Sequence, residues 1–208
     1  MTLRLQEVHP SLVHFPIALL PVSIGADVVG RATGNRGLLE TARHTMEIAA
    51  VGAALAGISG LVAQEEVNVE GETMDMLITH RNLNITATLL MSALAIWRNR
   101  RYRPSLGYLG LGLAGVGALT YSAYLGGSLV YRHGVGVKAA GGQYRENPPE
   151  LGESGENVKF AKDAAADLVH GVKHLGKETA QGKIVPSLTD GARRRTRAAA
   201  RSESAGTA

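Results

Sequence analysis

Four stretches of about 20 mainly apolar residues account for most of the first 131 positions of the chain. They run over 10–30, 44–63, 77–97 and 105–131, with short polar segments between them. A helix needs ~20 apolar residues to cross the hydrocarbon core of a bilayer. The second and fourth stretches carry almost no charge, whereas a soluble amphipathic helix has a charged outer face. The pattern predicts an all-α, integral membrane four-helix up-down bundle.

Charged residues between the stretches predict an orientation. The loops after the first and third stretches lie at the same end of such a bundle, here called side B, and the other end is side A. Side B holds seven of the ten Lys and Arg residues before position 138: Arg31, Arg36, Arg43, Arg98, Arg100, Arg101 and Arg103. The positive-inside rule then makes side B cytoplasmic. We expect a multi-pass protein of the plasma (inner) membrane with both termini outside the cytoplasm.

A polar tail follows the bundle, so we expect two regions, a transmembrane domain over 1–137 and a tail over 138–208. The tail begins with a linker rich in Gly, Pro and Glu, and its last residues have the basic composition of a disordered segment. Between them, spacings of three and four predict an amphipathic helix over about 157–179, suited to a membrane surface or a protein partner. Its apolar stripe is Val158, Ala161, Ala165, Leu168, Val172 and Leu175.

The absence of cysteine excludes several kinds of site. It rules out disulfides, thiolate zinc sites, cysteine-ligated iron–sulfur clusters, cysteine nucleophiles and covalently attached haem. No phosphate-binding loop or nucleophile–base pair is apparent, so the sequence assigns no catalytic residue, and no nucleic-acid partner is expected. The lipid bilayer is the partner that the apolar stretches require.

Four of the seven histidines fall at side A, namely His9, His14, His80 and His133. Ionisable residues inside a membrane span are rare and usually face the bundle interior. The first and third spans are diagonal in an up-down bundle, so His14 and His80 can approach one central point from opposite sides. Such a pair fits the two axial positions of haem b. His133 or His9 is the expected substitute ligand.

Three further residues belong to this predicted haem site. Arg81 and Arg132 lie at the same level and offer positive charge to the haem propionates. Asn84 follows His80 by four residues, so it shares the helix face and can hydrogen-bond the imidazole.

The spacing of His9 and His14 limits their use. Five residues correspond to about 140° around a helix, so a regular helix cannot direct both rings to one centre. If His9 is a ligand, Pro10 must first turn the chain.

A second polar set lies at side B, where Asp27, His44 and Glu47 are flanked by Arg31 and Arg43. We interpret it as a structural salt-bridge cluster near the headgroups.

Both end motifs resemble a known family. The segment His9–Leu19, HPSLVHFPIAL, resembles the opening of a bacterial family of predicted four-span membrane proteins called domain of unknown function 2231, and Tyr124–Val137, YLGGSLVYRHGVGV, is similar to its closing motif. With His80, the resemblance covers about residues 8–137. It implies the fold and the membrane location. The occurrence of some members beside Rieske-type domains implies redox work.

The leading hypothesis is therefore a b-type cytochrome-like electron-transfer subunit with an extracytoplasmic histidine cluster and a redox partner protein. One alternative is a bundle that binds zinc, copper or non-haem iron through the same histidines with Glu65 or Glu66. Another is a scaffold without cofactor that holds a partner through its tail. The glycine-rich fourth span also suits contact between subunits of a homo-oligomer.

Overall fold

Helices form nearly all of the described structure. The computed structural model describes residues 3–137, 150–151 and 157–189. Its elements are β1 (Leu3–Arg4), α1 (Leu5–Leu12), α2 (His14–Thr33), α3 (Arg36–Ala63), the 3₁₀ helix η1 (Gln64–Glu66), α4 (Gly71–Asn99), α5 (Leu106–Tyr131), β2 (Glu150–Leu151) and α6 (Asn157–Ala180). β1 and β2 form one short antiparallel pair. Most of the predicted linker and the basic segment from 190 onward lie outside the described residues.

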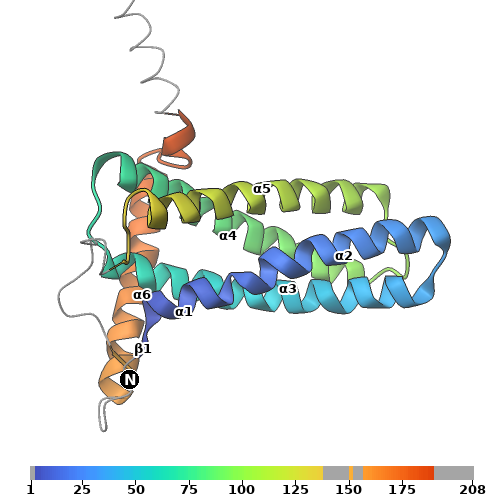
Figure 1. Cartoon of the computed structure of the whole chain (residues 1–208), viewed down its shortest axis with the longest axis horizontal. Coiled ribbons are helices and arrows are strands. Elements are labelled where there is room, and N and C mark those ends of the chain that lie inside the picture. Colours follow the sequence, from blue (N-terminus) through green and yellow to red (C-terminus); the bar gives the residue numbers. More distant parts are fainter. Residues whose placement is uncertain (1–2, 138–149, 152–156, 190–208) are drawn as a thin grey trace, which may run out of the picture.

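Helices α2 to α5 lie side by side and alternate in direction, with α1 leading into α2 (Figure 1). α2 packs on α3 and α5, α3 also packs on α4, and α4 packs on α5, so α2 and α4 are diagonal. α1 packs on α3 at side A. The prediction of an all-α membrane bundle is confirmed.

Proline interrupts the N-terminal span. α1 ends at Leu12 and α2 begins at His14, with Val13 between them. Pro16 has no amide hydrogen, so the carbonyl of Leu12 loses its partner in the next turn. The span therefore consists of two helical pieces.

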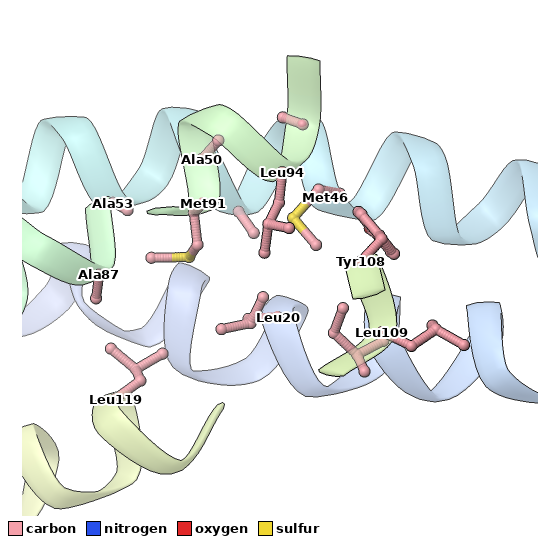
Figure 2. Close-up of a cluster of buried hydrophobic side chains, with 13 residues drawn as sticks. Leu20, Met46, Ala50, Ala53, Ala87, Met91, Leu94, Tyr108, Leu109 and Leu119 are labelled. Atoms are coloured by element: carbon pink, nitrogen blue, oxygen red, sulfur yellow. The ribbon is translucent and has the colours of Figure 1, made fainter. Parts of the chain in front are cut away.

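The bundle core contains many small side chains. Leu20, Met91 and Tyr108 are almost completely buried, and α3 faces them with alanines (Figure 2). The alanines of this cluster on α3 are Ala49, Ala50 and Ala53. Gly112 of α5 packs directly against Ile24, so α2 and α5 approach each other closely at that position.

The outer surface of the bundle is apolar as well. Large apolar side chains are exposed on every long helix, among them Val22, Val51, Leu55, Leu89, Ile96 and Leu113. Within the described residues, three stretches are long and apolar enough to cross a membrane: Val8–Thr33, Arg36–Glu66 and Leu106–Tyr131. Such surfaces require a lipid environment and indicate a multi-pass membrane protein.

The expected span at 77–97 lies within α4, which is not one of these three stretches. The first half of α4 carries a run of polar residues, which lowers its apolar character: Thr79, His80, Arg81, Asn82 and Asn84. A count of four spans therefore stays a prediction.

Helix α3 begins at Arg36, eight residues before the predicted span. The side chain of Asn35 accepts a hydrogen bond from the amide of Leu38 at 3.2 Å and caps the helix. The arginines at 36 and 43, expected in a loop, therefore lie on the first turns of α3.

A buried ion pair joins the helices at side B. Arg98 of α4 donates from Nε and Nη2 to the carboxylate of Asp27 on α2, at 2.9–3.0 Å. Its remaining hydrogens reach the carbonyl oxygens of Leu39, Arg101 and Tyr102 at 2.8, 2.6 and 3.1 Å. Both side chains are at most 2% exposed.

Asp27 pairs with Arg98, which lies outside the salt-bridge cluster predicted at side B. Arg31 instead donates to the carbonyl of Pro104 at 2.6 Å. Arg98 belongs to the last turn of α4, and this turn lies at the same level of the bundle as Asp27 on α2.

Helix α6 lies across the side-A end of the bundle (Figure 1). Gly171 faces the last turn of α3, where a Cβ atom would lie 2.7 Å from the carbonyl oxygen of Leu61. Arg81 of α4 donates to Glu178 at 2.6 Å, and His174 pairs with Glu65 at 2.9 Å. The tail helix is thus joined to both α3 and α4.

The docked face of α6 shares only Leu168 and Leu175 with the predicted apolar stripe. Val158, Ala161, Ala165 and Val172 are exposed. The buried and half-buried positions are Phe160, Ala164, Asp167, Leu168, Gly171, Leu175 and Glu178. Close approach at Gly171 and the ion pair of Glu178 determine which face is turned to the bundle.

We expect Asp27→Asn to lower the free energy of unfolding by about 3–5 kcal/mol, because it leaves the buried guanidinium of Arg98 without a counter-charge. Circular dichroism during thermal unfolding in detergent measures this loss. Arg100→Ala removes an exposed arginine from the same segment and should have little effect. Combining Asp27→Asn with Arg98→Met should restore part of the stability. Equal unfolding midpoints for Asp27→Asn and Arg100→Ala would contradict the role of this pair.

Gly171→Leu should release α6 from the bundle, because the new side chain collides with the backbone of α3; overpacking of this kind costs about 1–3 kcal/mol. Limited trypsin digestion of the folded protein measures the release as faster cleavage at Lys173 and Lys177. Gly176→Leu is the matched control, since no atom lies within 4 Å of a Cβ there. The docked position of α6 is wrong if both variants are cleaved at the wild-type rate.

Candidate histidine site

Two imidazole rings lie close together in an edge-to-face arrangement near the side-A end of the bundle. His9 of α1 and His80 of α4 have ring centroids 6.5 Å apart and ring planes at 84°. Both rings are partly buried. The structure therefore brings together residues that are 71 positions apart in the chain.

His9 is held by α3. Its Nδ1–H donates to the carbonyl oxygen of Ala56 at 2.9 Å, and the hydroxyl of Ser59 lies 3.4 Å from the same nitrogen. Gly60 makes room for the ring, because a Cβ atom there would lie 2.9 Å from Cε1 of His9. A side chain at position 60 would thus displace the imidazole.

His80 is held by α5 in a corresponding way. Its Nδ1–H donates to the carbonyl oxygen of Ser122 at 2.8 Å. Gly126 makes room for this ring, since a Cβ atom there would also lie 2.9 Å from Cε1. The amide of Asn84 lies 3.1 Å from Nε2 of His80, to which it can donate, and 2.9 Å from the His80 carbonyl.

These contacts assign the same tautomer to both rings. A carbonyl oxygen only accepts, so each Nδ1 carries the hydrogen and each Nε2 keeps its lone pair. Histidines that bind metals usually have this arrangement, in which the second ring nitrogen donates to a carbonyl or carboxylate. The pair therefore offers two oriented Nε2 ligands or two hydrogen-bond acceptors.

His14, the predicted partner of His80, lies elsewhere. It is exposed, and its Nδ1–H donates to the carbonyl oxygen of Pro10 at 2.6 Å. The angular separation of positions 9 and 14 explains why only one of them faces inward. The structure turns His9 inward, one of the two expected substitutes.

The other predicted residues surround the pair at greater distance. Nδ1 of His133 lies 3.0 Å from the hydroxyl of Thr73, and the guanidinium of Arg132 lies 5.8 Å from the ring centre of Tyr124. Arg81 is buried and hydrogen-bonds to Glu178, Gln64 and Asn82. Asn84, also predicted for this site, hydrogen-bonds to His80.

Sequence reasoning missed the residues on α3 that hold His9. Ala56, Ser59 and Gly60 belong to an apolar run with no polar signal beyond the serine. The cluster of small residues at the level of His9 is the one feature that could have indicated them.

A metal site made only of protein ligands is not found in the described part of the chain. No three or more His, Asp or Glu side chains there are grouped so that they could hold a metal ion. Glu65, proposed as a ligand, instead pairs with His174. Haem differs in this respect, because the porphyrin supplies four ligands and the protein needs to supply only two.

Comparison with known proteins gives one match. The family model described as predicted membrane protein (DUF2231) matches residues 6–139, which include α1 to α5 and all four histidines of side A. No curated protein and no solved structure matches the chain. The tail helix α6 lies beyond the matched region.

Gly126→Ala should lower the free energy of unfolding by about 1–3 kcal/mol, because the added methyl group pushes on the ring of His80. Gly127→Ala is the matched control on the same helix, where a Cβ atom meets nothing within 4 Å. Alanine favours a helix over glycine by about 1 kcal/mol, so the control should be neutral or stabilising. Thermal unfolding in detergent compares the two. The packing of His80 against α5 is refuted if Gly126→Ala is as stable as Gly127→Ala.

Proposed function

The chain belongs to the DUF2231 family of predicted membrane proteins, and from this premise we propose that it is a b-type cytochrome-like electron-transfer subunit that holds haem b between His9 and His80. The observation that carries the proposal is the close pair of imidazoles inside a helical membrane bundle. Ionisable side chains in such a place usually serve a function.

The donor set fits this cofactor. Haem iron in electron-transfer proteins takes axial ligands from two sides, and neutral imidazole with a free Nε2 is a suitable ligand. With both axial positions held by the protein, haem would supply one-electron transfer rather than chemistry on a bound substrate. Gly60 and Gly126 let the two rings pack directly against the backbones of α3 and α5.

The residues of the chain have definite tasks in this proposal. The carbonyl oxygens of Ala56 and Ser122 hold the two rings and make each Nε2 a stronger donor of its lone pair. The amide of Asn84 lies 3.1 Å from Nε2 of His80 and would have to turn away for His80 to hold haem through this nitrogen.

Some parts of the proposal are supported by the sequence alone. They are propionate binding by Arg81 or Arg132, a redox partner at side A, a homo-oligomer, and a plasma-membrane location with extracytoplasmic termini. His14 and His133 are not ligands in this proposal. It therefore differs from the sequence-based hypothesis, which paired His14 with His80.

A scaffold without cofactor is the second candidate. The observation that favours it is the attachment of α6 to the bundle through the ion pair of Arg81 with Glu178. In this alternative the tail presents a surface that binds a partner protein. Deletion of 138–208 then abolishes the function of the protein in the cell, whereas histidine substitutions do not.

We expect detergent-purified protein, expressed with haem supplied, to show sharp α and β bands and a Soret shift in a reduced-minus-oxidised visible spectrum. His9→Ala and His80→Ala should each abolish or strongly alter these bands, because each removes one axial ligand. His14→Ala is the matched control on the same span and should leave the spectrum unchanged.

The outcomes separate the candidates. Loss of the bands in His14→Ala but not in His9→Ala would refute His9 as the ligand. A featureless wild-type spectrum with no haem by pyridine haemochrome assay would refute the cytochrome proposal and favour the scaffold.

A further inference from the structure

We propose that helix α6 rests on the lipid surface at side A. Its exposed apolar stripe is turned to the acyl-chain boundary, and its lysines bind anionic headgroups. The stripe is formed by Val158, Ala161, Ala165, Val169 and Val172. This stripe has spacings of three and four, so it lies on one side of the helix. It is separate from the face that docks on the bundle. The proposal is independent of haem binding.

The stripe is uncovered in the folded chain. Val158 is 68% exposed, and Val169 and Val172 are each 53% exposed. By helical geometry, the centre of the stripe lies about 110–120° around α6 from the docked face around Gly171. Docking on α3 and α4 therefore leaves the stripe without a protein contact in this chain, among the residues described.

The position of α6 suits a bilayer surface. α6 lies across the axis of the bundle, so it runs parallel to the membrane plane when the bundle crosses the membrane (Figure 1). It docks beside Leu61, in the last turn of α3, and Gln64 and Glu65 follow as the first polar residues after this apolar helix. That transition marks the headgroup level. The N-terminal part of α6 extends beyond α1 and α3 in this view, where lipid would surround the bundle.

The charges on α6 favour an anionic surface. Four lysines are exposed along the helix: Lys159, Lys162, Lys173 and Lys177. Of its acidic residues, Asp167 is buried and Glu178 is paired with Arg81, so Asp163 is the only exposed carboxylate of α6. Lys162 and Lys173 border the stripe, and such lysines extend their ammonium groups to headgroups while their methylene chains cover apolar surface.

The absence of cysteine from the whole chain permits a direct test. Single-cysteine variants Val172→Cys and His170→Cys carry a nitroxide label on the stripe and on the opposite exposed side, in otherwise native full-length protein. The protein is reconstituted in vesicles of phosphatidylcholine with phosphatidylglycerol, or of phosphatidylcholine alone. Relaxation by oxygen reports lipid contact, and relaxation by a water-soluble nickel chelate reports water contact.

In anionic vesicles we expect the label at 172 to be accessible to oxygen and protected from nickel, and the label at 170 to show the reverse. In phosphatidylcholine alone, nickel accessibility at 172 should rise, because the lysines lose their headgroup partners. Equal nickel accessibility at 172 and 170 in anionic vesicles would overturn the proposal. Protection of 172 from both reagents would overturn it in favour of a protein partner or a second copy.

The pair Val169→Cys and His170→Cys repeats the measurement if a label at 172 prevents folding. Oxygen access at 169 without nickel access, and the reverse at 170, supports the proposal. Unchanged nickel access at 169 between the two lipid compositions would refute the role of anionic headgroups.

Discussion

The pairing of Arg98 with Asp27 sets the alignment of the helices at side B. One guanidinium reaches α2 through Asp27, α3 through the carbonyl of Leu39 and the α4–α5 connection through the carbonyl of Tyr102. An ion pair without water is costly unless its geometry is good and its remaining hydrogens are bonded. Since neighbouring apolar surfaces can slide past one another with little penalty, this directional contact fixes which residues meet along the bundle.

The histidine pair depends on that alignment. His9 and His80 meet only if α3 and α5 present Gly60 and Gly126 at the right height. On α5, a shift by one helical turn in one direction would bring Leu129 or Val130 to the place of Gly126 beside the ring of His80. The bundle therefore has one hydrogen-bonded polar contact near each end. Between these two contacts, alanine-rich packing holds the helices together.

The sequence predicts the helices better than it predicts their contacts. Hydropathy locates the long helices because a bilayer imposes length and apolar character on each one separately. The inward position of His9 depends on how α1 packs against α3, which no local pattern records. The same holds for the pairing of Asp27 with Arg98 rather than Arg31, and for the docked face of α6, which Gly171 determines through the absence of a side chain.

The break at Val13 gives the histidine pair a mechanical property of its own. His9 lies on an eight-residue helix that is separated from α2 by one residue, while His80 lies within the continuous α4. Hydrogen bonds missing at prolines make such a junction softer than a regular helix. Bending at this junction would shift His9 relative to His80, so the packing of α1 on α3 and the hydrogen bond of His9 to Ala56 are what hold the ring in place.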